Sequence, residues 1–65
     1  MFVIVNGERT ETNATRLPEL LAELQHEDAH IAIAVNEEVV PRGSWSQQVL
    51  RDGDAIEILT PRQGG

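Results

Sequence analysis

The sequence has no cysteine and no lysine, and only two of its 65 residues are aromatic, Phe2 and Trp45. Without cysteine, no disulfide can stabilise the fold and no side-chain thiol can carry sulfur. Without lysine, the only amine available for joining one copy of the chain to another is the α-amino group of Met1. Stability must therefore come from one small core, since a chain this short buries only about 60% of its unfolded surface.

Positive charge is also scarce. Five arginines stand against eleven acidic residues, which gives a formal net charge of −6. Binding to nucleic acid or to an anionic membrane needs clustered basic side chains, so the composition argues against both. We therefore expect protein partners, with no nucleic acid and no membrane, and an acidic chain fits a basic partner surface.

Long hydrophobic runs are missing as well. The apolar run at residues 2–5, directly after Met1, is too short for a signal-peptide core or a membrane span, which predicts a cytoplasmic protein. A chain of this size also leaves little material for the walls of a ligand cleft, which takes roughly 300 Å³ or more. We therefore expect no enzyme activity, and a protein that other enzymes act on.

The first half of the sequence predicts a strand hairpin and then one helix. Residues 2–5 end at Asn6-Gly7, a strong signal for a two-residue turn, and residues 8–13 suit the returning strand. Thr15 is the expected N-cap of the helix, which would end between residues 25 and 28. Four leucines at helical spacing form its apolar stripe: Leu17, Leu20, Leu21 and Leu24.

The second half predicts three more strands. Residues 31–35 alternate large and small apolar side chains, residues 38–41 form a short strand, and residues 55–60 form the last strand. The element order predicts an α+β fold of the β-grasp, ubiquitin-like type. In this arrangement a mixed sheet of four to five strands, with its terminal strands parallel, packs on one helix.

A polar segment separates the last two strands. Residues 43–48 are expected to form a loop or a single helical turn, with Trp45 turned inward because of the area it can bury. Val49 and Leu50 are expected to point inward with it.

We expect a single domain at residues 1–60 and a flexible C-terminal tail at residues 61–65. Glycines at positions 64 and 65 would let the chain lie extended in a narrow channel and present its carboxylate. A carboxylate becomes reactive when attack on ATP turns its oxygen into a leaving group, with Mg²⁺ stabilising the phosphates. Because no phosphate-binding loop motif is present, ATP and Mg²⁺ are expected to be used by an activating partner, with no tightly bound cofactor here.

Residues 26–30 match the H-E-x-x-H pattern of zinc enzymes. That pattern requires a stable helix that presents both imidazoles, a further ligand and a substrate cleft. Here it falls at the expected end of the helix, directly before a strand. We therefore expect a solvated polar connection and no metal site.

Several segments spread along the chain share a pattern with one known family. They are Asn6 in the opening hairpin, Leu20-Leu21, residues 35–42 followed by Trp45, the turn at residues 52–54, and the terminal Gly64-Gly65. Together they resemble the ThiS family, over the whole chain and most specifically between residues 36 and 65.

The resemblance implies a sulfur carrier protein in thiamine (thiazole) biosynthesis. A ThiF-like adenylating enzyme would adenylate the C-terminal carboxyl of Gly65, with Gly64 allowing the required tail conformation. A cysteine desulfurase or another sulfur donor would then convert the adenylate to a thiocarboxylate. Thiazole synthase would take the sulfur from that thiocarboxylate.

The first strand is apolar on both faces, which predicts a partner surface. If Val3 and Val5 face the helix, the alternate side chains face outward, and an exposed apolar patch often marks a protein–protein interface. The alternative is that loops of the chain or a second copy cover this patch. The expected partner surface comprises Phe2, Ile4, Ala32, Ala34, Leu59 and Arg62.

Three other functions remain open. A molybdopterin-synthase small subunit would use the same fold, tail and thiocarboxylate, and it would insert its tail into a larger synthase subunit. A ubiquitin-like modifier would be joined to target lysines through isopeptide bonds. A passive β-grasp interaction module would not need Gly65 at all.

Overall fold

The computed structural model describes residues 1–25 and 30–60 of the chain. Along the chain, the described elements are β1 (Phe2–Val5), β2 (Glu8–Glu11), α1 (Leu17–Glu23), β3 (Ala32–Val35), β4 (Glu38–Val39), the 3₁₀ helix η1 (Arg42–Gln47) and β5 (Ala55–Leu59). The predicted order of hairpin, helix, strand, short strand and strand is confirmed. The expected tail, residues 61–65, lies outside the described residues.

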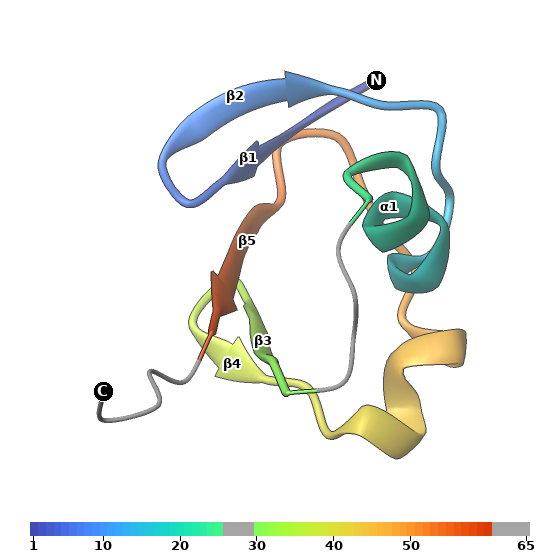
Figure 1. The fold of residues 1–65 in the computed structure, drawn as a ribbon. Helices are drawn as coiled ribbons and strands as arrows, with labels where there is room; N and C mark the ends of the chain where they lie inside the picture. The colour runs from blue at the N-terminus through green and yellow to red at the C-terminus, as the bar shows by residue number, and fades with distance from the viewer. Residues whose placement is uncertain (26–29, 61–65) are drawn as a thin grey trace.

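The strands form one five-stranded sheet in the order β2-β1-β5-β3-β4. The terminal strands β1 and β5 pair in parallel, and the other neighbours pair antiparallel. Figure 1 shows α1 and η1 on one side of this sheet, and no helix of the described residues lies on the opposite side. The predicted mixed sheet packed on one helix, the β-grasp arrangement, is therefore confirmed.

The core lies between the sheet and α1. The largest side chains removed from solvent come from both layers, and they are Val3, Leu17, Leu20, Ile33 and Ile56. Trp45 is also buried, as predicted, and its indole N–H donates to the Val40 carbonyl at 2.9 Å. Leu50 points inward as expected, whereas Val49 is 45% exposed, so its predicted burial is wrong.

Both hairpin turns use residues with left-handed backbone conformations. In the turn between β1 and β2, Asn6 and Gly7 have φ values of 51° and 87°, and in the turn between β3 and β4, Asn36 and Glu37 have values of 53° and 70°. Positive φ at both central residues is the geometry of type I′ turns, which match the twist of the strands that they join. The predicted Asn6-Gly7 turn is thus confirmed.

The helix is shorter than predicted at both ends. Its N-cap is Arg16, one residue after the predicted Thr15, and its last residue is Glu23. Gln25 has a φ of 59°, and a left-handed residue cannot continue a right-handed helix. Leu24 is the C-cap, and residues 26–28 of the expected helix end lie outside the described residues. No helix within the described residues is long and apolar enough to cross a membrane.

The carboxylate of Glu19 closes the N-terminus of α1. Its Oε1 accepts hydrogen bonds from the Thr15 backbone N–H at 2.7 Å, the Thr15 hydroxyl at 3.0 Å and the Arg16 backbone N–H at 3.3 Å. These donors favour the charged form and lower the pKa of Glu19 below its usual 4.5. Thr15 therefore contributes to the helix start through Glu19, although it is not the N-cap.

Replacing Glu19 with Gln is expected to remove part of the acid sensitivity of the fold. A carboxyl whose pKa is lower in the folded state stabilises that state above its unfolded pKa, and this contribution is lost as the pH falls through the folded value. The wild type should therefore have the higher urea midpoint at neutral pH, and its advantage over E19Q should shrink below pH 4.5. An equal difference between the urea midpoints of the two proteins at neutral pH and below pH 4.5 would contradict this prediction.

Candidate functional site

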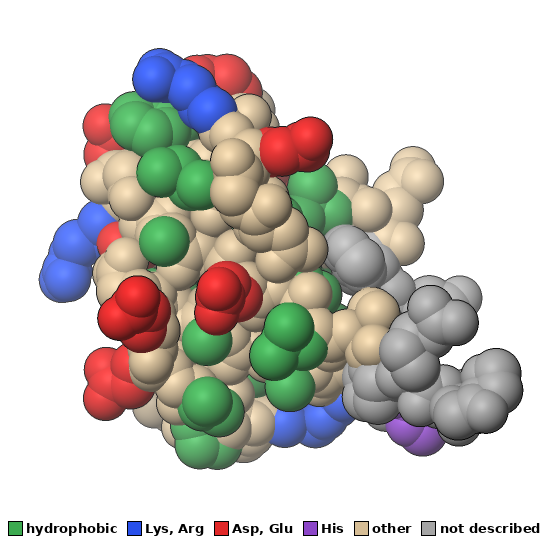
Figure 2. Space-filling view, turned by 90° about the vertical axis from the view of Figure 1, so that its left-hand side faces the viewer, with side chains coloured by type: hydrophobic (Ala, Val, Ile, Leu, Met, Phe, Trp, Pro, Cys, Tyr) green, Lys and Arg blue, Asp and Glu red, His purple; other side chains and the backbone are tan. Residues whose placement is uncertain are grey.

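The side of the sheet opposite α1 forms the outer face, which is open in the described part of the chain. Successive side chains on a strand point to opposite sides, so the strand register assigns the members of this face. They are Phe2, Ile4, Arg9, Glu11, Ala32, Ala34, Val39, Ala55, Glu57 and Leu59. Figure 2 looks onto this side and shows hydrophobic side chains spread across it with acidic side chains among them.

The residues of the predicted partner surface mostly come together on the outer face. Phe2 and Ile4 are half-buried on β1, while Ala32 and Leu59 are exposed and directly paired on neighbouring strands. Ala34 was expected to be exposed and is only 6% exposed. Its short methyl group stands between two directly paired residues with larger side chains, Val39 and Glu57. Arg62 lies outside the described residues.

Val39 extends the outer face and was missed by sequence reasoning. It is 71% exposed, and it pairs directly with Ala34. The available signal was the pair of successive valines in a short strand, because two neighbours in a strand cannot both face the core. Since Val40 is buried, Val39 has to face outward.

Charged side chains lie at two places on the outer face. At one edge, the guanidinium of Arg9 lies 3.8 Å from the centre of the Phe2 ring and 3.8 Å from the Glu11 carboxylate. The ion pair is exposed and contributes little to stability, whereas the stacking covers one side of Phe2. Glu57 lies on β5, the middle strand of the sheet, among apolar neighbours. A cationic side chain of a partner would complement it there.

The end of β5 is held by a residue from the first hairpin. The backbone N–H of Ile58 donates to the Asn6 side-chain oxygen at 2.9 Å, and the Asn6 side-chain amide donates to the Ile58 carbonyl at 3.4 Å. These two residues are 52 positions apart in the sequence. Leu59 ends β5, so this contact lies directly before the segment that leads to Gly64 and Gly65, both outside the described residues.

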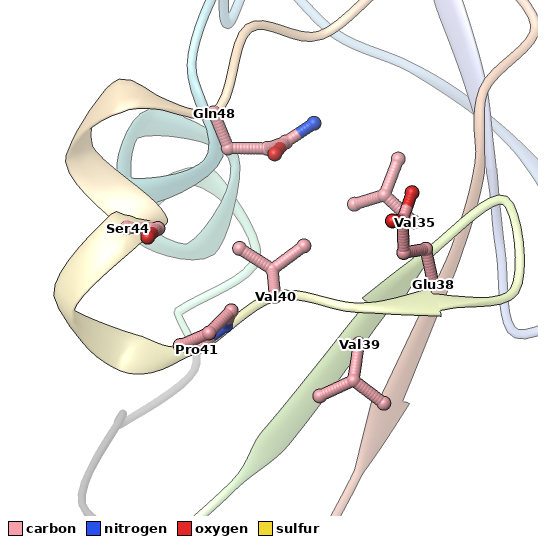
Figure 3. Close-up of a pocket in the computed structure, with 7 residues that line it drawn as sticks. All are labelled: Val35, Glu38, Val39, Val40, Pro41, Ser44 and Gln48. Carbon is pink, nitrogen blue, oxygen red and sulfur yellow. The ribbon is translucent and has the colours of Figure 1, made fainter.

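A shallow hollow of about 260 Å³ lies between β4 and η1. Figure 3 shows Val35 and Val40 at its floor, with Gln48 reaching toward Glu38, while Val39 points away to the other side of the strand. Pro41 and Ser44 complete the lining. The hollow is smaller than most ligand pockets, which measure about 300–1,000 Å³, and Glu38 is its one ionisable lining residue among those described.

The described residues do not gather ligands for a metal ion. No group of three or more His, Asp or Glu side chains lies close enough to hold one among residues 1–25 and 30–60. Residues 26–29 of the H-E-x-x-H match, which include its first histidine, lie outside the described residues. The expectation that this segment is a solvated connection therefore stays a prediction.

Known sequences resemble this chain along its whole length. The model of the ThiS family matches residues 3–65. The sulfur carrier protein ThiS of Escherichia coli (strain K12) is 40% identical over 66 residues, and the alignment covers 100% of both proteins. A thiazole synthase of Paramagnetospirillum magneticum is 36% identical over 66 residues, which is 100% of this chain and 20% of that protein.

Two solved structures share the fold and at least 30% of the aligned residues. The crystal structure of a thiamine biosynthesis protein (ThiS) from Geobacter metallireducens has a TM-score of 0.85 and 30% identity, with full coverage of both chains. A chain in the complex of subunits 1 and 2 of the molybdopterin-converting factor from Helicobacter pylori has a TM-score of 0.67 and 31% identity, again with full coverage. The family match over residues 3–65 and the end-to-end likeness to curated ThiS establish that this chain belongs to the ThiS family.

Proposed function

We propose that this chain is a sulfur carrier protein of thiamine (thiazole) biosynthesis, which carries sulfur as a thiocarboxylate on the C-terminal carboxyl of Gly65. The observation that supports this most directly is the family match, which extends from residue 3 through Gly65 and so includes both terminal glycines. The relative from Escherichia coli that aligns end to end with this chain is itself named a sulfur carrier protein.

The chemistry proceeds in two displacement steps. One carboxylate oxygen of Gly65 attacks the α-phosphorus of ATP, which forms an acyl-adenylate and releases pyrophosphate. Hydrosulfide then attacks the acyl carbon and displaces AMP, which leaves the thiocarboxylate. A persulfide donor would give an acyl disulfide first, and a second thiol would be needed to release the thiocarboxylate.

Partner enzymes supply the reactive sites for these steps. The shallow hollow between β4 and η1 has one carboxylate and no cationic side chain in its lining. Binding ATP and Mg²⁺ needs cationic groups and metal ligands around the phosphates. We therefore assign adenylation to a ThiF-like enzyme and the sulfur supply to a cysteine desulfurase or another donor, with this chain as their substrate. We place these reactions in the cytoplasm.

Thiazole synthase is the proposed acceptor of the sulfur. The likeness of the whole chain to a fifth of a protein named thiazole synthase supports this assignment, because the carrier-like segment and the synthase occur there in one polypeptide.

The test of this proposal is intact mass spectrometry. The protein with its native C-terminus is incubated with ATP, Mg²⁺, a sulfide source and a ThiF-like enzyme. Exchange of one oxygen for one sulfur, located at Gly65 by fragmentation and dependent on ATP, is the expected result. An unchanged mass, with an enzyme that loads a known ThiS in parallel, would overturn the proposal.

A molybdopterin-synthase small subunit is the second candidate. The observation that favours it is the match to the Helicobacter pylori molybdopterin-converting factor, although its TM-score of 0.67 is lower than the 0.85 of the thiamine protein. Both candidates predict the thiocarboxylate, so the acceptor distinguishes them. The loaded chain should donate its sulfur in the reaction of a thiazole synthase, and it should not donate sulfur to a large molybdopterin-synthase subunit.

Leu59→Ala is expected to weaken docking to the adenylating partner without destabilising the fold. Leu59 is 58% exposed on the outer face, so truncating it should change the unfolding free energy by less than about 0.5 kcal/mol. Loss of its buried area in a complex, at about 0.8 kcal/mol per CH₂, should raise the dissociation constant about tenfold or more. Calorimetric titration with the adenylating enzyme measures this change.

Val49→Ala provides the matched control. Val49 is 45% exposed, and it bridges to Arg16 at the start of α1, away from the outer face. Its truncation should leave the dissociation constant unchanged. Equal weakening by both substitutions would contradict the assignment of the outer face as the docking surface.

A further inference from the structure

The last part of β5 extends beyond the backbone of its parallel neighbour. The N–H groups of Ile4 and Asn6 donate to the carbonyls of Asp54 and Ile56, each at 2.8 Å. In a regular parallel ladder, the next bond would run from the Ile58 N–H to the backbone carbonyl of Asn6. The chain turns away at Asn6, where φ is 51°, and the ladder position of that carbonyl is left open.

The side chain of Asn6 takes the place of the missing backbone groups. Its oxygen accepts from the Ile58 N–H at 2.9 Å, and its amide nitrogen donates to the Ile58 carbonyl at 3.4 Å. One primary amide therefore satisfies both backbone groups on the side of Ile58 that faces β1. Without it, the end of β5 would be held only by β3, through the pairs Ile33–Ile58 and Ala32–Leu59.

We propose that the side-chain amide of Asn6 is a positioning group, which fixes the end of β5 and thereby the point from which residues 61–65 are delivered to a partner. The inference rests on the proposed function, since it assigns Asn6 a part in the reaction of Gly65. Its physical basis is that reacting atoms must be held about 3–3.5 Å apart, and that a displacement of about 1 Å can slow a reaction by about 100-fold.

The second hairpin offers a matched comparison at the opposite end of the same strand. Asn36 also has a left-handed conformation, with φ of 53°, and its side-chain oxygen accepts from the Ala55 N–H at 3.0 Å. Its amide nitrogen donates to the Asp54 carboxylate, also at 3.0 Å. Asn36 thus holds the beginning of β5 as Asn6 holds its end, but it lies far along the strand from the tail.

Asn6→Gly and Asn36→Gly are therefore the pair of variants to compare. Glycine adopts positive φ without strain, so each variant loses its side-chain amide and keeps the turn. Amide hydrogen exchange by NMR should show protection lost at the Ile58 N–H in N6G and at the Ala55 N–H in N36G. We expect each rate to rise about tenfold, the order of one net hydrogen bond.

The kinetic readout is pyrophosphate release by a ThiF-like adenylating enzyme with each carrier as substrate. N6G should lower kcat about tenfold, a change that corresponds to about 1.36 kcal/mol. KM should change less than kcat, because N6G removes no side chain from the outer face and affects that face only through Leu59, which follows Ile58. N36G should change neither constant. Asn6→Asp, which keeps the acceptor for Ile58 and loses the donor, should fall between N6G and the wild type.

The outcomes separate the inference from the proposed function. Unchanged exchange at Ile58 in N6G, or an equal loss of kcat in N6G and N36G, would overturn the positioning role of Asn6. A wild-type chain that is not adenylated at all would overturn the proposed function. In that case the exchange experiment still decides whether Asn6 holds the end of β5.

Discussion

Deleting Gly65 is expected to abolish ATP-dependent loading of this chain with sulfur. The variant would end in the carboxylate of Gly64, which has the same chemical reactivity as the natural terminus. Its position relative to the folded domain is different, and the partner enzyme can adenylate only a carboxylate that reaches its active site. Loading followed by intact mass spectrometry should show no exchange of oxygen for sulfur under conditions that load the wild type completely.

The expected loss follows from the reach of an extended chain. Each residue spans about 3.3–3.6 Å, so removing one residue withdraws the carboxylate by that distance when the domain is docked. A displacement of about 1 Å can lower a rate by about 100-fold, so a shift of a whole residue should lower it by at least that factor. A tail that is bound fully extended could not recover this distance while the outer face stays docked.

An added residue provides the complementary control. A variant with one alanine after Gly65 has its carboxylate one residue too far, and it should fail to load for the opposite geometric reason. Both variants should unfold at the wild-type temperature, because the described core uses no residue beyond Ile58. Full loading of the deletion variant would contradict this prediction, because it would show that the reaction does not depend on the position of the carboxyl of Gly65.

Much of the fold could be predicted because the spacing of apolar residues in the sequence follows the spacing of buried positions along a strand or a helix. Residues 31–35 alternate large and small side chains, and the structure places Ile33 and Val35 in the core as that alternation requires. The leucine stripe of α1 and the Asn6-Gly7 turn could also be predicted from the sequence. Each of these signals is local, so the prediction does not depend on contacts between distant segments.

One missed feature is a local backbone conformation, and the others depend on contacts between distant segments. The early end of α1 follows from the left-handed conformation of Gln25. A glutamine in a sequence does not predict this conformation. The two bonds of Asn6 to Ile58 require the strand order to be known. Burial of Ala34 likewise depends on which side chains lie across from it.

The candidate site was predictable in a different way. The terminal glycines and the resemblance of residues 35–42 to the ThiS family indicated a reactive C-terminus, and the family match through residue 65 supports that hypothesis. The outer face was predicted because β1 is apolar on both faces, which identified Phe2 and Ile4. Its full extent, including Val39 and the central Glu57, became visible only when β3, β4 and β5 were placed beside one another.

Leu20→Ala is expected to be the most destabilising of the substitutions considered. Leu20 is fully buried between α1 and the sheet, and Leu→Ala changes in a core lower the unfolding free energy by about 2–5 kcal/mol. A chain of this length has a total stability of about 3–10 kcal/mol, at roughly 0.05–0.15 kcal/mol per residue. The substitution should therefore remove a large part of the stability, measured as the shift in the urea unfolding midpoint.

The same substitution at Leu59 is the control, because it removes the same atoms from a side chain that is 58% exposed. L59A should keep the wild-type urea midpoint and lose affinity for the adenylating partner, whereas L20A should lose stability and keep its affinity at low temperature, where it remains folded. This crossed pattern would show that the two faces of one sheet serve separate purposes, with stability on the α1 side and recognition on the outer face. Loss of affinity in folded L20A as large as in L59A would contradict that division, because Leu20 would then be shaping the docking surface through the sheet.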